Sequence, residues 1–65
     1  MKYDSILERL DEKIVSLVDD RVSMYAVFNR LKDVYIDIIK SGYMSNESYL
    51  ELAAYVIYAG FLMEE

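Results

Sequence analysis

The chain has 65 residues, of which 55% are hydrophobic, and twelve acidic against seven basic side chains give a formal net charge of −5. We expect a single domain over residues 1–65, which at this size buries only roughly 60% of the surface that the unfolded chain exposes. With no Cys and no His, disulfides and zinc-type metal sites are excluded, so oligomerisation or a partner is the remaining source of extra stability. The acidic excess argues against direct binding to nucleic acid.

No segment of the sequence is typical of secretion or of membrane insertion. The N-terminal residues MKYDSILERL place charges where a secretory signal requires an unbroken apolar segment. The most apolar stretch, residues 49–63, is shorter than the roughly twenty residues that cross a bilayer. We therefore expect a cytoplasmic protein without membrane contact.

The first predicted helix covers residues 5–19. Ser5 and Glu8 have the spacing of a capping box, in which a hydroxyl and a carboxylate satisfy free backbone N–H groups at a helix start. The helical period places six apolar side chains on one face, which predicts that this face packs into a core. These residues are Ile6, Leu7, Leu10, Ile14, Leu17 and Val18.

The segment 19–23, with the sequence DDRVS, allows two interpretations. Two Asp, a β-branched Val and a Ser lower helix propensity, and Asp20 or Ser23 is suited to cap a second helix, so we predict a short turn. However, an apolar heptad continues through it with Arg21 as the sole misfit. The alternative is one continuous helix over residues 5–40, roughly 54 Å long, paired with a second chain as a dimeric helical bundle.

The second predicted helix covers residues 23–41 and has a broad apolar face. Its end is marked by Lys40 in the last turn and by Gly42, which can adopt the positive φ that closes many helices. The apolar face is formed by Met24, Val27, Phe28, Leu31, Val34, Tyr35, Ile38 and Ile39.

The third predicted helix covers residues 45–63, with Ser45 as its N-cap. The loop that precedes it is very short, and loops of this length join antiparallel neighbours. The sequence therefore predicts an all-α, compact three-helix bundle in which the second and third helices form an antiparallel hairpin.

Residues 49–63 carry a single charge, Glu51, and are apolar around most of the helix. We expect the side containing the small residues Ala53 and Gly60 to face the core, because small residues let another helix approach closely. This expected inner face consists of Tyr49, Ala53, Val56, Ile57 and Gly60, flanked by Leu52, Met63 and Leu50.

The opposite side of the same helix carries Glu51, Tyr55, Tyr58 and Leu62, which would be exposed in a three-helix monomer. Tyr is enriched at protein interfaces because it supplies rigid contact area at low entropic cost. A helix without a clearly polar face is normally buried on both sides. We therefore predict that these four residues bind a partner or a second copy; the alternative is an ordinary surface with scattered apolar side chains.

No pattern indicates catalysis, a cofactor or a metal. The carboxylates around the first helix lack the spacing of a calcium loop, and no Gly-rich loop or Ser–His pair is present. We assign them to a solvated face; they are Glu8, Asp11, Glu12, Asp19 and Asp20. The sequence thus favours a small, non-enzymatic, regulatory or accessory interaction module that binds itself as a homodimer, another protein, or both. The alternative is an acidic inhibitor that imitates nucleic acid and blocks the basic site of a nucleic-acid-binding protein.

Overall fold

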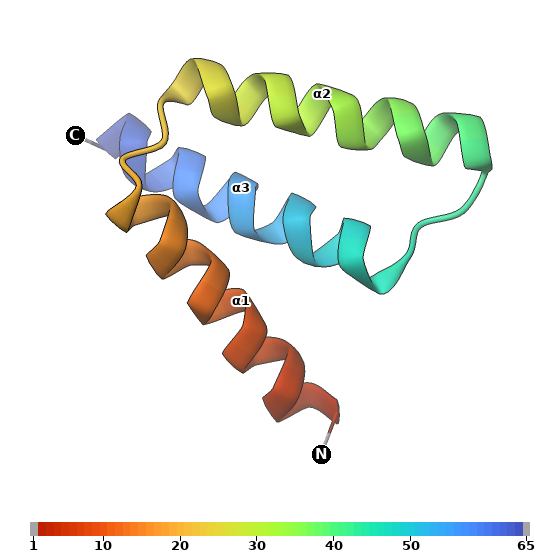
Figure 1. Cartoon of the computed structure of the whole chain (residues 1–65), viewed down its shortest axis with the longest axis horizontal. Coiled ribbons are helices and arrows are strands. Elements are labelled where there is room, and N and C mark those ends of the chain that lie inside the picture. Colours follow the sequence, from red (N-terminus) through yellow and green to blue (C-terminus); the bar gives the residue numbers. More distant parts are fainter. Residues whose placement is uncertain (1, 65) are drawn as a thin grey trace.

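A computed structural model describes residues 2–64, which form three helices joined by short connections (Figure 1). Helix α1 spans Lys2–Asp19, α2 spans Met24–Ser41 and α3 spans Asn46–Glu64. No strand occurs in this part of the chain. The all-α three-helix fold and the antiparallel pairing of α2 with α3 are confirmed.

The expected start of the first helix at Ser5 is wrong. Helix α1 already includes Lys2, so Ser5 lies inside it and is no N-cap. The residues from Lys2 to Asp4 contain no Gly or Pro and therefore have no strong tendency to break a helix. The Ser5–Glu8 spacing was misleading because residues three apart are neighbours anywhere along a helix.

Helix α1 ends in a hydrogen-bonded turn that the sequence only partly reveals. Arg21 adopts a left-handed conformation, with φ of 52°, and its N–H donates to the carbonyl of Val18 at 3.1 Å. The next N–H, of Val22, donates to the carbonyl of Leu17 at 3.2 Å. This bond pair is the Schellman motif that stops a helix, with an apolar contact between its two ends. The continuous helix over residues 5–40 is therefore wrong, and the predicted turn is confirmed.

The remaining helix ends follow the capping residues that the sequence predicts. The Ser23 side chain accepts a hydrogen bond from the N–H of Ala26 at 3.2 Å and begins α2. Gly42, with φ of 67°, ends α2 by donating its N–H to the carbonyl of Ile38 at 2.8 Å. The Ser45 side chain accepts from the N–H of Ser48 at 3.1 Å and begins α3.

Helix α3 is the centre of the fold. Helices α1 and α2 each pack against α3, and within residues 2–64 they make no close backbone approach to one another. Figure 1 shows α2 running antiparallel beside α3, whereas α1 diverges from that pair towards its N-terminal end. The molecule is therefore flattened, with extents of 35 × 30 × 18 Å.

The core is small because only part of each predicted apolar face is used. On α1, Leu17 is buried and Leu10 and Ile14 pack against the core, but Leu7 and Val18 are more than half exposed. Helix α2 buries Val27 and Val34 and leaves Phe28, Tyr35 and Ile39 exposed. The main core cluster consists of Leu17, Val27, Ala54, Tyr55, Tyr58 and Ala59.

None of the helices within residues 2–64 combines the length and the apolar character that a membrane-spanning segment needs.

Candidate protein-interaction surface

The four residues predicted to bind a partner lie on the inner side of α3. Tyr58 is only 4% exposed and Tyr55 only 9%, and both belong to the core cluster. Leu62 packs against that cluster, and Glu51 is partly buried. The expectation that this side of α3 is exposed is wrong, so the reason for assigning a partner-binding role to these residues is removed.

Tyr58 explains much of this inward orientation. Its hydroxyl donates a hydrogen bond to the backbone carbonyl of Val22 at 2.7 Å. The ring of Tyr58 is buried while its polar end satisfies a carbonyl group in the turn between α1 and α2. A tyrosine on this side of α3 therefore holds all three helices together at one point.

Tyr55 and Glu51 contact charged side chains of the other helices. The ammonium group of Lys13 lies 5.7 Å from the centroid of the Tyr55 ring, within the range of a cation–π interaction. Glu51 forms an ion pair with Arg30 of α2, with 2.9 Å between Nη2 and Oε2. The hydrogen bond to Glu51, together with the charge of that carboxylate, raises the pKa of Arg30. Both contacts are internal to the fold.

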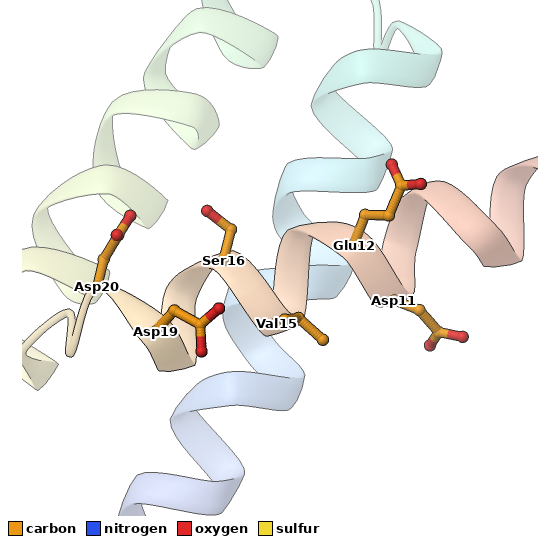
Figure 2. A pocket seen from close by; sticks show the side chains of 6 residues that line it. All are labelled: Asp11, Glu12, Val15, Ser16, Asp19 and Asp20. Carbon is orange, nitrogen blue, oxygen red and sulfur yellow. The ribbon is translucent and has the colours of Figure 1, made fainter.

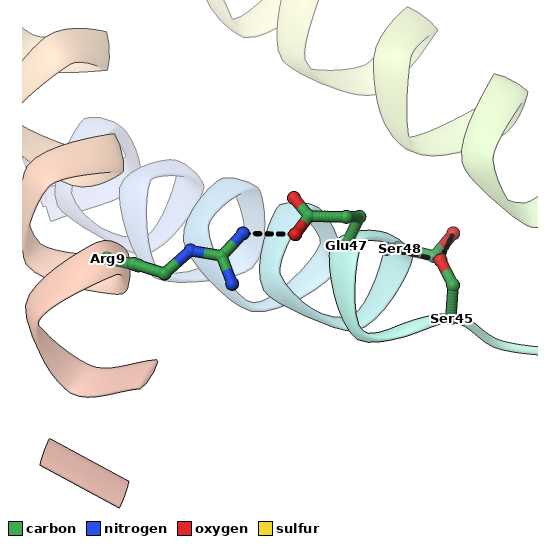
Figure 3. A network of polar contacts seen from close by, with 4 residues as sticks. All are labelled: Arg9, Ser45, Glu47 and Ser48. Carbon is green, nitrogen blue, oxygen red and sulfur yellow. Dashed lines mark hydrogen bonds and ion pairs between the residues drawn. The ribbon is translucent and has the colours of Figure 1, made fainter. Parts of the chain in front are cut away.

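A second ion pair connects α1 to the first turn of α3. Figure 3 shows Arg9 extending from α1 to the carboxylate of Glu47, with the hydroxyl groups of Ser45 and Ser48 in contact nearby. The side chains of this ion pair are 44% and 69% exposed, for Arg9 and Glu47 respectively, so the pair is expected to contribute no more than about 1 kcal/mol. The pair joins α1 to the start of α3, but the buried contacts of Tyr58 and the core cluster determine which side of α3 faces α1.

The side of α3 that was expected to face the core is largely exposed and borders α1 only at Tyr49 and Ala53. Val56 is 55% exposed, Tyr49 60% and Met63 77%, and Gly60 is also exposed. The assignment of this side as the inner face is wrong, because the tyrosine side makes the interhelical contacts described above. We refer to it as the outward face of α3; it consists of Tyr49, Ala53, Val56, Ile57, Gly60 and Met63.

The outward face continues into two shallow hollows. One lies along α3 and the preceding loop, and is lined by Met44, Tyr49, Leu52, Ala53, Val56 and Ile57. The other lies between α1 and α3, and is lined by Ile6, Leu7, Leu10, Asn46, Tyr49 and Ala53. Tyr49 and Ala53 line both hollows, which joins them into one largely apolar surface that no Asp, Glu, Lys or Arg side chain lines.

The carboxylates of α1 line a different depression. Figure 2 shows Asp11 and Asp19 pointing to one side of α1, and Glu12 and Asp20 to the other. The depression thus lies along two ridges of one helix, and its carboxylates do not converge on a point. Within residues 2–64, no group of three or more His, Cys, Asp or Glu side chains is placed to hold a metal ion.

The fold and this surface define a small three-helix bundle whose central helix is covered on one side only. No protein-family model, no curated protein and no solved structure matches the chain. Its function therefore has to be inferred from its own geometry.

Proposed function

We propose that this protein is a non-enzymatic protein–protein interaction module that acts through the outward face of α3. The observation that carries the proposal is the continuous, uncharged apolar surface that runs from α3 onto the N-terminal half of α1. Large contiguous apolar patches are rare on monomeric proteins and mark binding sites for other molecules. The occupant is a second copy of the chain, another protein, or both.

The balance between core and surface supports this proposal. Among the side chains that the structure describes, in residues 5–64, only seven hydrophobic ones are buried, whereas sixteen large hydrophobic ones are exposed. Scattered apolar side chains are normal on protein surfaces, but a small domain with so thin a core depends on further burial for stability. Binding through the outward face would supply that burial.

The hollows also favour binding over catalysis. An active site combines a concave pocket with several convergent polar groups, whereas the hollow along α3 is open, and the hydroxyl of Tyr49 is the one polar side-chain group among its lining residues. We therefore propose a regulatory or accessory role, and we retain the cytoplasm as the expected compartment.

The test is a comparison of what the chain binds with and without a charge on the outward face. A tagged chain is co-expressed with a differently tagged copy in cells of its source, and all bound proteins are identified. Val56→Glu places a carboxylate at the centre of the face and is expected to abolish binding while the helical circular dichroism signal persists. Lys32→Glu is the matched control, because Lys32 is an exposed residue of α2. This variant is expected to bind as the unmodified chain does. Identical bound proteins for both variants would refute the proposal.

The acidic inhibitor that imitates nucleic acid stays a prediction with weaker support. The depression lined by carboxylates of α1 and the following turn contains no Lys or Arg, which is the observation in favour of this function. Against it, these carboxylates point to two sides of the helix and do not form one acidic surface. Binding through these charges would weaken steeply as ionic strength rises, whereas apolar binding through α3 would persist. Measuring any identified interaction in low and high salt separates the two functions.

A further inference from the structure

We infer that the outward face of α3 is covered by α3 of a second copy of this chain, packed antiparallel across a two-fold axis between Val56 and Ile57. This inference rests on the proposed function and names the occupant of the same surface. It draws on the size of the exposed surface, on the positions of the small residues and on the charges at the ends of α3.

The exposed area matches what a dimer of standard size buries. The chain exposes 5141 Å², whereas a folded monomer of 7.6 kDa is expected to expose about 4,300 Å². The excess of roughly 800 Å² equals the area that each partner contributes to a standard protein–protein interface. A symmetric contact of standard size with a second copy would bury about this much area on each chain.

The small residues of α3 are placed for such a contact. With the axis between Val56 and Ile57, Ala53 of one copy lies level with Gly60 of the other. A Cβ atom added to Gly60 would meet no atom within 4 Å, so nothing inside one chain requires glycine there. Glycine inside a helix costs about 1 kcal/mol relative to alanine. Close approach of a second α3 gives this glycine a structural reason.

The same register pairs a protruding side chain with a hollow. Met63 is 77% exposed at one end of the outward face. In the antiparallel pair it lies level with residue 50 of the second copy, next to the hollow that Tyr49 and Ala53 line. A methionine side chain is flexible and fills irregular apolar spaces well. The two-fold axis creates this contact twice.

The charges at the ends of α3 favour the antiparallel over the parallel direction. Helix α3 has acidic Glu47 in its first turn and no basic residue in its last turn, where Glu64 lies. A carboxylate is unfavourable at a helix C-terminus and favourable near an N-terminus. The antiparallel pair brings Glu64 of each copy near the N-terminal turns of the other α3. That first turn also carries Glu47, whose carboxylate is paired with Arg9 of its own chain. A parallel pair would lack the contact of Glu64 with a helix N-terminus and would place the two Glu64 carboxylates beside each other at the C-termini.

The test uses single cysteines, because the natural chain contains none. Residue 56 lies beside its own counterpart across the axis, so purified Val56→Cys is expected to form a disulfide-linked dimer under a mild oxidant. The two residues at position 49 lie roughly 22 Å apart along the helices, so Tyr49→Cys is expected to remain unlinked. The helical circular dichroism signal confirms that each variant is folded.

Two results would overturn the inference. Linkage of both variants would indicate a parallel pair, and linkage of neither would show that no second copy covers α3. In the latter case the proposed function still stands if another protein binds the chain and is lost with Val56→Glu. If no binding depends on Val56, the proposed function fails as well.

A second variant tests the close approach at Gly60. Gly60→Leu introduces a good helix former into open space of the single chain, but its side chain would separate the two helices at Ala53 of the second copy. We expect its dimer dissociation constant to rise about tenfold or more. An unchanged constant in sedimentation equilibrium would overturn the proposed register.

Discussion

The hydroxyl of Tyr58 connects the last helix to the turn between the first two. The ring is 4% exposed, and its hydroxyl donates to the Val22 carbonyl at 2.7 Å. A buried tyrosine without such a partner would leave a polar group unsatisfied, which costs about 1–3 kcal/mol. This hydrogen bond lets Tyr58 be buried without an unsatisfied polar group, so the tyrosine side of α3 can face the core.

Removing this hydroxyl is expected to destabilise the fold. Tyr58→Phe keeps the ring and deletes the hydrogen bond to Val22, so the free energy of unfolding should fall by about 1 kcal/mol in urea denaturation. Tyr25 is 78% exposed, and Tyr25→Phe serves as the matched control with no expected effect. Equal stability of the two variants would show that the bond to Val22 contributes nothing.

Arg21 occupies a backbone position that favours glycine. Its φ of 52° lies in the left-handed region, which costs roughly 1–2 kcal/mol for a residue with a Cβ atom. Arg21→Gly removes this strain from the folded state but also increases the conformational entropy of the unfolded chain. Because the first effect is larger, the free energy of unfolding is expected to rise by about 0.5–1 kcal/mol. Lys32 is an exposed residue in the middle of α2, and Lys32→Gly is expected to lower the free energy of unfolding by about 1 kcal/mol. Destabilisation by both would contradict the strained turn.

At the scale of the helices, capping residues predicted the start and end of α2 and the start of α3, whereas the capping-box spacing at Ser5 misplaced the start of α1. Ser23, Gly42 and Ser45 each act as the sequence predicts, because their side chains or backbone freedom satisfy helix ends locally. The break after Asp19 was less evident, since arginine rarely adopts the left-handed conformation that forms the turn. The local sequence thus predicts the three helices and several of their ends, but not the left-handed residue that ends α1.

The orientation of α3 could not be predicted from its sequence. Apolar residues surround this helix, so helical periodicity does not single out one side. The decisive contacts are distant in the chain: Tyr58 with Val22, and Glu51 with Arg30. Gly60 and Ala53 were expected to mark the packed side, but small residues also occur on exposed sides, and a Cβ atom at Gly60 would meet no neighbour in the structure.

The cap at the start of α2 gives a prediction at the element scale. Ser23→Ala removes the hydrogen bond to the N–H of Ala26 and is expected to cost about 1 kcal/mol of stability. Ser16 lies exposed inside α1, and Ser16→Ala is the matched control that should cause no loss, because alanine has the higher helix propensity. Thermal unfolding of both variants, followed by circular dichroism, checks this difference. A loss in the control as large as in Ser23→Ala would contradict the assigned cap.

For the whole molecule, the flat arrangement and the thin core make stability depend on association. If two copies cover each other's α3, mass action stabilises the folded dimer, and the midpoint of thermal unfolding should rise with protein concentration. For Val56→Glu the midpoint should be lower and independent of concentration. A midpoint that does not change with concentration in the unmodified chain would argue against a dimer.

The mass of the unmodified chain in solution tests the central claim most directly. Sedimentation equilibrium between about 1 and 100 µM measures this mass without any substitution. With 7.6 kDa for one chain, the proposed pairing through α3 predicts a species of about 15 kDa at the upper end of this range. A mass of one chain at every concentration would contradict it.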